Sequence, residues 1–300
     1  MTDDTSPTYV VVTPAFNEEK YIHHPIESML RQTILPFKWI IVDDGSQDGT
    51  AQIIEAVAKQ HDWIDYHYIN KNPGQTYYSS NVYAILKGIK LVEELPYSHL
   101  AILDADIDLC DDYYERIFEK FAHNEALGIA TGTYLEQEGN DWVAKRTDPK
   151  HTPKAIQVFT RECYEKCNGY IPFKYGGEDT GIAVMARMNG WKTWSFDDIL
   201  VKHYRAVGTG DGRSLLRGRF RLGMTDYCIG THPFFMILKS IKRMFKEKPY
   251  CLSGVVRLIG YLSGGLRSLE RQLPEAAINY LREEQMLRLT KPQANNWKLE

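Results

Sequence analysis

The sequence predicts an α/β protein with a mostly parallel sheet, helices on both faces of that sheet, and a basic helical extension at its C-terminal end. Three observations lead to this prediction. Short apolar runs of β-forming residues alternate with longer stretches of helical periodicity through the first 200 residues. Acidic residues follow directly after several of these runs. Beyond residue 213 the pattern becomes helical, and its local charge turns positive.

The alternation is clearest in the first half of the chain. The first four predicted strands are residues 9–12, 39–42, 66–69 and 100–103, and the helices between them are residues 26–32, 50–60 and 77–93. An order of this kind implies a parallel sheet covered on both faces. Further strands are expected at 129–135, 191–196 and 199–203, with helices at 112–124 and 179–189. The polar segment 136–155 is predicted to be a loop.

The composition is that of a globular protein. The chain has 300 residues, a net charge of −3 and 43% hydrophobic residues, which excludes disordered and fibrous classes. It contains no run of 18 apolar residues, and its first residues do not resemble a secretory signal. Five scattered cysteines are typical of free thiols in a reducing compartment. We therefore expect a cytoplasmic protein.

Charge divides the chain into two predicted parts, a catalytic domain at 1–210 and a basic helical extension at 211–300. Residues 201–270 hold 13 Lys and Arg against four Asp and Glu, whereas residues 1–200 carry a net charge of −13. Basic residues beside apolar clusters such as 234–238 favour a helix at an anionic membrane surface, on its cytoplasmic face. The alternative is a segment that packs on the catalytic domain. No nucleic-acid-binding motif accompanies the positive charge, so no nucleic acid partner is expected.

Two acids follow the fourth predicted strand. Open α/β sheets bind ligands at the carboxyl ends of their strands. The side chains of Asp104 and Asp106, two residues apart, point the same way and can hold one divalent cation. Such a cation would neutralise a diphosphate leaving group. The alternative is a cluster that stabilises a turn and caps a helix.

Two more pairs of adjacent acids, Asp43-Asp44 and Glu178-Asp179, stand at the ends of predicted elements. Asp44, after the second strand, can accept a hydrogen bond from a nucleobase or a ribose hydroxyl; the alternative is a turn. Glu178 and Asp179 follow two glycines that are predicted to be a hinge, and a carboxylate there can take a proton from an acceptor hydroxyl. The alternative is that Asp179 is the N-cap of the next helix.

His203 and Arg205 end the last predicted strand. An imidazole beside carboxylates can complete a metal site, and mixed oxygen and nitrogen ligation suits Mn²⁺ better than Mg²⁺. The guanidinium of Arg205 can meet phosphate charge. A histidine that stands alone in a sequence is usually not a metal ligand. The prediction for His203 therefore depends on the acidic residues expected beside it.

Taken in order, these motifs resemble family 2 of the GT-A glycosyltransferases, over roughly residues 8–210. The matching segments are VVTPAFNEE at 11–19, SMLRQT at 28–33, IVDDGSQDGT at 41–50, NPG at 72–74, LDAD at 103–106, GED at 177–179 and His203. The resemblance implies a GT-A, Rossmann-like sheet. It also implies an inverting transfer from a nucleotide-diphospho-sugar, with a UDP-sugar as the expected donor and Mn²⁺ or Mg²⁺ as cofactor. The acceptor would be a hydroxyl on a glycan or lipid-linked molecule, in polysaccharide or glycolipid biosynthesis.

The resemblance also assigns roles to residues. The donor base and ribose would contact Thr13, Phe16 and Asp44, with Asn17 or Glu18 nearby and Asp104 on the ribose side. Asp106 would bind the metal, His203 would contact the metal or the diphosphate, and Asp179 would be the catalytic base, next to Glu178.

The sequence departs from the family at two places. Many relatives carry Ala-Arg-Asn where this chain has Ser79-Ser80-Asn81, so an arginine that could help to hold the donor is missing. The Gln/Arg-x-x-Arg-Trp signature of processive synthases is also absent, which predicts addition of a single sugar.

Two other functions fit parts of the sequence. A haloacid-dehalogenase-type phosphatase has a similar strand and Asp-x-Asp, but Asp108 stands where that family has Thr or Val. A catalytically inactive sugar-nucleotide-binding protein or membrane scaffold is the second alternative. The joint presence of Asp44, Asp106, Asp179 and His203 argues against it.

Overall fold

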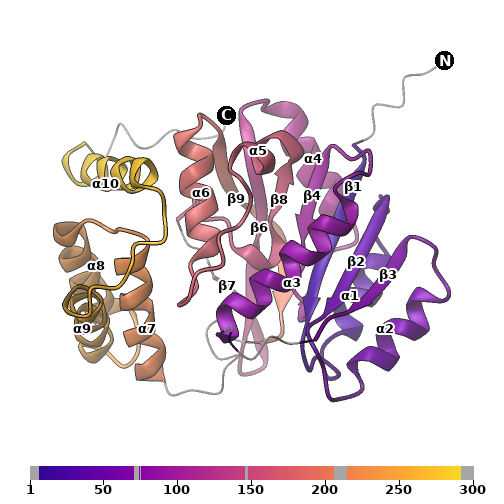
Figure 1. The fold of residues 1–300 in the computed structure, drawn as a ribbon, viewed down its shortest axis with the longest axis horizontal. Helices are drawn as coiled ribbons and strands as arrows, with labels where there is room; N and C mark the ends of the chain where they lie inside the picture. The colour runs from indigo at the N-terminus through magenta and orange to yellow at the C-terminus, as the bar shows by residue number, and fades with distance from the viewer. Residues whose placement is uncertain (1–6, 71–73, 75, 146–147, 206–214, 292–300) are drawn as a thin grey trace.

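A computed structural model describes residues 7–70, 74, 76–145, 148–205 and 215–291, and its centre is one curled mixed sheet (Figure 1). The strands are β1 (Tyr9–Ala15), β2 (Lys38–Asp43), β3 (Ile64–Tyr68), β4 (His99–Ile102), β5 (Ile107–Asp108), β6 (Leu127–Glu138), β7 (Asp141–Ala144), β8 (Val158–Thr160) and β9 (Lys192–His203). Their order is β3-β2-β1-β4-β8-β6-β9-β5, with β7 paired to β6. The first four of these strands run parallel, as predicted.

Helices cover both faces of the sheet, which confirms the predicted class. Those of the catalytic part are α1 (His23–Leu30), α2 (Thr50–Ala58), α3 (Tyr77–Val92), α4 (Tyr113–His123), α5 (Arg161–Lys166) and α6 (Glu178–Met188), with a short 3₁₀ turn, η1 (Lys154–Ile156). The helices α1, α2 and α4 pack on one face of the sheet. The helices α3, α5 and α6 pack on the other.

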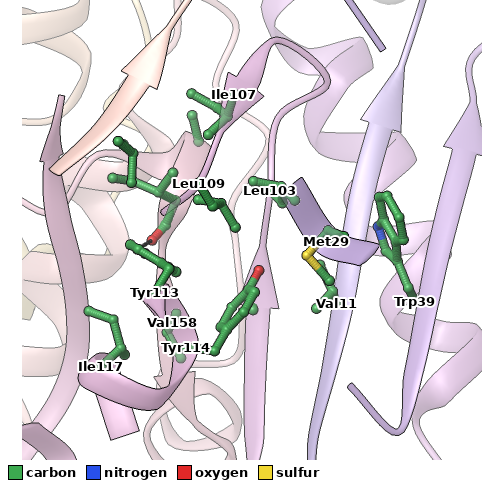
Figure 2. Packing of buried hydrophobic residues seen from close by; sticks show 14 of the residues in the cluster. Val11, Met29, Trp39, Leu103, Ile107, Leu109, Tyr113, Tyr114, Ile117 and Val158 are labelled. Atoms are coloured by element: carbon green, nitrogen blue, oxygen red, sulfur yellow. Dashed lines mark hydrogen bonds between the residues drawn. The ribbon is translucent and has the colours of Figure 1, made fainter. Parts of the chain in front are cut away.

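The first strand is central because side chains on both of its faces are buried. Val11 packs with Met29 and Trp39 on the first face, as Figure 2 shows. Val10 and Val12 belong to the core of the second face. Parallel registry then aligns the carboxyl ends of neighbouring strands, since Ala15 pairs with Asp43 and Val12 with Ile102. The polar residues that follow β1, β2 and β4 are thereby brought to one edge.

Four helices form the C-terminal extension: α7 (Leu215–Cys228), α8 (Pro233–Lys246), α9 (Leu252–Leu266) and α10 (Glu275–Thr290). The last of these packs on α6, where Arg187 makes a two-pronged ion pair with Glu284 at 3.1 and 2.9 Å. The predicted boundary at 210/211 lies outside the described residues, so the exact division of the chain stays a prediction.

The structure differs from the predicted elements in three places. Residues 191–196 and 199–203 contribute to one strand, β9, whose pairing with β6 is interrupted by register shifts. The segment 136–155 is not all loop, because β6 continues to Glu138 and turns at Gly139, at a φ of 65°, into β7. The short elements β8 and α5 had no periodicity by which they could be recognised.

The helices α7 and α9 approach each other so closely that only glycine fits at their crossing. A Cβ on Gly260 would lie 2.1 Å from the carbonyl oxygen of Phe220. Gly260→Ala should therefore force the helices apart and lower the free energy of unfolding by about 1–3 kcal/mol, as measured by urea denaturation.

Gly218→Ala is the matched control, since nothing lies within 4 Å of a Cβ at that position of α7. It should raise stability by up to about 1 kcal/mol through helix propensity. Equal effects of the two substitutions would contradict the packing described here.

Candidate active site

The predicted carboxylates gather where the carboxyl ends of the strands meet. Asp44 follows β2, and both Asp104 and Asp106 follow β4. The histidine arrives from the other half of the sheet, because β5 pairs antiparallel with β9 and sets Ile107 opposite His203. Residues separated by about 100 positions thus become neighbours.

Asp106 is the centre of a buried polar chain. Its Oδ1 lies 3.5 Å from His203 Nε2, and its Oδ2 lies 3.7 Å from Arg205 Nε. Arg205 also pairs with Glu18, which follows β1. Burial would raise the pKa of Asp106, but the hydrogen bond from His203 and the charges of His203, Arg205 and Lys154 hold that pKa below its usual value.

The two partners at the ends of this chain are perturbed as well. Burial would lower the pKa of His203, yet the hydrogen bond and charge of Asp106 raise it, helped by Asp104. Burial raises the pKa of Glu18 to about 7, although Arg205 opposes the shift. Perturbed pKa values in neighbouring groups are typical of functional sites.

A buried lysine that the sequence did not reveal holds the other acid of the pair. Lys154 Nζ lies 2.9 and 3.2 Å from the two carboxylate oxygens of Asp104, and 2.6 Å from Asn81 Oδ1. Burial would lower the pKa of Lys154, but Asp104, Glu178 and Asp179 raise it. The lysine comes from the polar segment predicted to be a loop, where no motif or periodicity marks it.

This lysine bears on the missing arginine of α3. Ser80, which stands in place of that arginine, donates its hydroxyl hydrogen bond to Asp44. The next residue, Asn81, contacts Lys154. A positive charge therefore lies beside α3 even though the helix itself does not supply it.

The start of α6 holds the predicted base. Gly177 is the N-cap of this helix, at a φ of 107°, which residues other than glycine rarely adopt. The alternative prediction, that Asp179 is the N-cap, is therefore wrong. Asp179 accepts a hydrogen bond from the backbone N–H of Thr180 at 2.6 Å, and His151 Nε2 lies 3.8 Å from it. Its side chain is partly exposed, as an acceptor hydroxyl would require.

The glutamate beside the base is buried. Burial raises the pKa of Glu178 to about 7, Asp179 adds to this shift, and Lys154 opposes it. Among the residues that the structure describes, Glu178 Oε2 has no hydrogen-bond partner. From β6, the phenol of Tyr134 is buried near the same acids, and its pKa is raised well above 10 by burial and by the charges of Asp104 and Asp179.

The loops after β1 and β2 are bonded to each other. Asn17, at a φ of 54°, accepts from the backbone of Gln47 at 2.8 Å and donates its own backbone N–H to Ser46 Oγ. Phe16 is partly exposed at the same edge. Thr13 is fully buried, and its hydroxyl accepts a hydrogen bond from Trp39. The donor contacts predicted for Thr13, Phe16 and Asn17 stay predictions, and the Thr13 hydroxyl is engaged in the core.

Two of the predicted metal ligands, Asp106 and His203, lie close enough to share one ion. Within the described ranges, no group of three or more His, Cys, Asp and Glu is arranged to hold an ion. The atoms Asp106 Oδ1 and His203 Nε2 do fit as two ligands, because cis ligands on an ion with bonds of about 2.1 Å lie about 3 Å apart. Substrate phosphates commonly supply the remaining ligands of such an ion. The prediction that Asp104 is also a ligand stays a prediction, since its oxygens are occupied by Lys154.

The raised pKa of Glu178 predicts how stability depends on pH. Its usual value is 4.5, so between about pH 4.5 and 7 the folded chain keeps a proton that the unfolded chain releases. Stability from this group is present below pH 4.5 and is lost as the pH rises through 7. This loss should reach about 3 kcal/mol in the wild type and should be absent from Glu178→Gln.

Urea denaturation between pH 5 and pH 8 measures this difference. The exposed Glu162→Gln of α5 is the control and should follow the wild-type profile. Identical pH slopes for Glu178→Gln and the wild type would show that Glu178 is not buried as described.

The chain resembles known proteins in sequence. The profile of Glycosyl transferase family 2 matches residues 10–187. The candidate teichuronic acid biosynthesis glycosyltransferase TuaG of Bacillus subtilis (strain 168) is 29% identical over 134 residues, which are 44% of this chain and 50% of that protein. The poly-β-1,6-N-acetyl-D-glucosamine synthase of Staphylococcus epidermidis is 32% identical over 119 residues, 39% of this chain and 26% of that one. The chain thus spans half or less of the length of these relatives.

Solved structures share the fold of this chain. Their sequence identities are low, so the similarity shows the fold alone. S. aureus TarS 1–349 in complex with UDP-GlcNAc has a TM-score of 0.57 and 12% identity, and the match covers 97% of this chain and 93% of that one. Mannosyltransferase PcManGT from Pyrobaculum calidifontis, in complex with GDP-Man and Mn²⁺, has a TM-score of 0.56 and 15% identity, covering 95% and 81%. With a family profile matched over more than half of its length and this fold, the chain belongs to Glycosyl transferase family 2, and its fold is GT-A.

Proposed function

We propose that the protein is an inverting glycosyltransferase that moves a single sugar from a nucleotide-diphospho-sugar to a hydroxyl group. One observation carries this proposal. Acids from separate elements, Asp44, Asp106 and Asp179, lie at one edge of the sheet together with Lys154 and Arg205. Family membership removes the support for the phosphatase alternative.

The proposed donor site uses both kinds of charge. Asp44 accepts a hydrogen bond from the base or ribose, and Arg205 and Lys154 attract the diphosphate. Asp106 and His203 would hold a divalent cation, which supplies charge neutralisation for the departing diphosphate. Two neighbours of the same fold were solved with UDP-GlcNAc and GDP-Man, which supports this class of donor. A UDP-sugar remains our expectation.

The acceptor hydroxyl would give its proton to Asp179. A direct displacement inverts the anomeric carbon and needs one base rather than an enzyme nucleophile. Asp179 suits this role better than Glu178, because it is partly exposed while Glu178 is buried. Glu178 would act by setting the charge around Lys154 and Asp179. Relatives named for teichuronic acid and poly-N-acetylglucosamine support a glycan or lipid-linked acceptor in polysaccharide or glycolipid assembly.

Donor binding should stabilise the protein in a metal-dependent way. A ligand at 100 times its Kd adds about 2.7 kcal/mol. Thermal melting with UDP-, GDP-, dTDP- and CMP-sugars, each with Mn²⁺ or with EDTA, should give a shift for one nucleotide with Mn²⁺ alone. An absence of any shift would contradict the donor site. A shift without any transfer to acceptors would favour the alternative, a catalytically inactive sugar-nucleotide-binding protein or scaffold.

Removing the base should separate chemistry from binding. Asp179→Asn is expected to lower kcat by about 10²- to 10⁴-fold while the donor-induced thermal shift persists. Asp65→Asn is a matched control, because Asp65 pairs with Lys38 near the amino ends of β3 and β2, away from the carboxyl edge. If Asp179→Asn turned over at the wild-type rate, the assignment of the base would be wrong.

A further inference from the structure

We propose that the outward faces of α8 and α9 form a docking surface for an anionic lipid bilayer. This lipid-docking face consists of two apolar stripes. The stripe of α9 is Leu252, Val255, Ile259, Leu262 and Leu266; the stripe of α8 is Phe234, Ile237, Leu238, Ile241 and Phe245. Every one of these side chains is exposed, Phe245 by 74% and Leu266 by 89%. Figure 1 shows both helices on the side of α7 that faces away from the sheet.

Helix α9 is inverted relative to an ordinary surface helix. Its one charged residue, Arg257, points inward and contacts buried Asp226 through Nε at 2.9 Å and Nη2 at 2.8 Å. Lys239 of α8 joins the same carboxylate at 2.7 Å. A helix at a water interface turns its polar side outward, so a polar inside with an apolar outside indicates an apolar medium beyond it.

The helices beneath the lipid-docking face pack closely against one another through glycines. A Cβ on Gly254 would lie 2.2 Å from the carbonyl oxygen of Ser240, and one on Gly223 would lie 2.0 Å from that of Arg257. Close contact through small residues is how helices associate where lipid removes the hydrophobic drive. The large apolar side chains of α9 are then left for the outer surface.

The occupant follows from the charges around the stripes. The helices of this face and their ends carry five exposed basic residues: Arg217 on α7, Lys242 and Lys246 on α8, Lys248 just after α8, and Arg267 just after α9. Within 215–268, all of which the structure describes, the two acids Asp226 and Glu247 are both paired with basic groups and largely buried. These basic residues attract anionic lipid, whereas a second copy of the same face would bring like charges together.

The packing changes which residues support the membrane contact that the sequence predicted. Four of the basic residues that suggested a membrane surface, namely Arg219, Lys239, Arg243 and Arg257, are paired internally. Positive charge is therefore a smaller part of the case than the sequence implied. The apolar stripes, whose direction only the packing reveals, are the larger part.

The geometry indicates a helix pair lying in the interface. With 14 and 15 residues, α8 and α9 are about 21 and 22 Å long, short of the roughly 30 Å of a bilayer core. Within the described ranges, none of the helices combines the length and the apolar character that a membrane crossing demands. Such helices bury their apolar side about 5–10 Å into the headgroup boundary.

The docked face would also lie close to the catalytic edge. Arg221 and Thr225 of α7 both donate to the carbonyl oxygen of Tyr175, at 2.6 and 2.8 Å, two residues before the N-cap of α6. Helix α7 thus lies between the lipid-docking face and the segment that leads into α6, where Asp179 stands. This step alone rests on the proposed function, and it would bring the base to a lipid-linked acceptor.

Vesicle sedimentation of the full chain, without nucleotide, tests the docking face apart from activity. The wild type should bind phosphatidylcholine vesicles that contain phosphatidylglycerol. Ile259→Asp with Leu262→Asp should lower the bound-to-free ratio by about tenfold or more. Lys242→Gln with Lys246→Gln and Lys248→Gln should lose about fivefold per lysine on anionic vesicles only.

The matched control is Leu35→Asp with Leu91→Asp, which replaces leucines 49% and 43% exposed on the catalytic part. It should bind as the wild type does, and circular dichroism should show all variants folded. Three outcomes would overturn the proposal: wild-type protein that stays in the supernatant with the vesicles that contain phosphatidylglycerol, unchanged binding by the α9 variant, or a wild-type dimer that this variant converts to monomer.

Discussion

The acids at the carboxyl edge of the sheet require compensating cations, and the second half of the chain supplies them. The fold brings the buried acids Glu18, Asp106 and Glu178 together with the partly buried Asp104. Unpaired buried carboxylates would cost several kcal/mol each, so cations must come from elsewhere in the chain. They come from distant segments: Lys154 from the turn before β8, and Arg205 with His203 from the end of β9.

This requirement accounts for much of the second half of the fold. The short strand β5 holds β9 so that His203 faces Asp106, and η1 places Lys154 between Asp104 and α3. The extension continues the arrangement, since α7 bonds the loop before α6 and α10 is tied to α6 by Arg187 and Glu284. Residues near the start of α6 are therefore held from the sheet and from the extension at once. The extension therefore contacts both α6 and the segment that leads into it.

Local patterns in the sequence were sufficient for much of the fold and for part of the site. Apolar runs revealed β1, β2 and β4, and the acids after them were recognisable because parallel strands end at one edge. Lys154 was not recognisable, because it lies in an aperiodic polar segment and its role comes from contacts with Asp104 and Asn81. The same limit applies to Arg257, whose contact with Asp226 depends on the packing of α9 against α7. Residue types can be read from the sequence. The direction in which a side chain points and its partners far along the chain depend on tertiary packing.

A co-crystal structure with a nucleotide diphosphate and Mn²⁺ would test directly whether the carboxyl edge of the sheet is the donor site. We expect the base or ribose at Asp44, the diphosphate beside Arg205 and Lys154, and Mn²⁺ bound by Asp106 and His203. A nucleotide bound elsewhere would contradict this expectation. So would a diphosphate at this edge whose metal touches neither Asp106 nor His203.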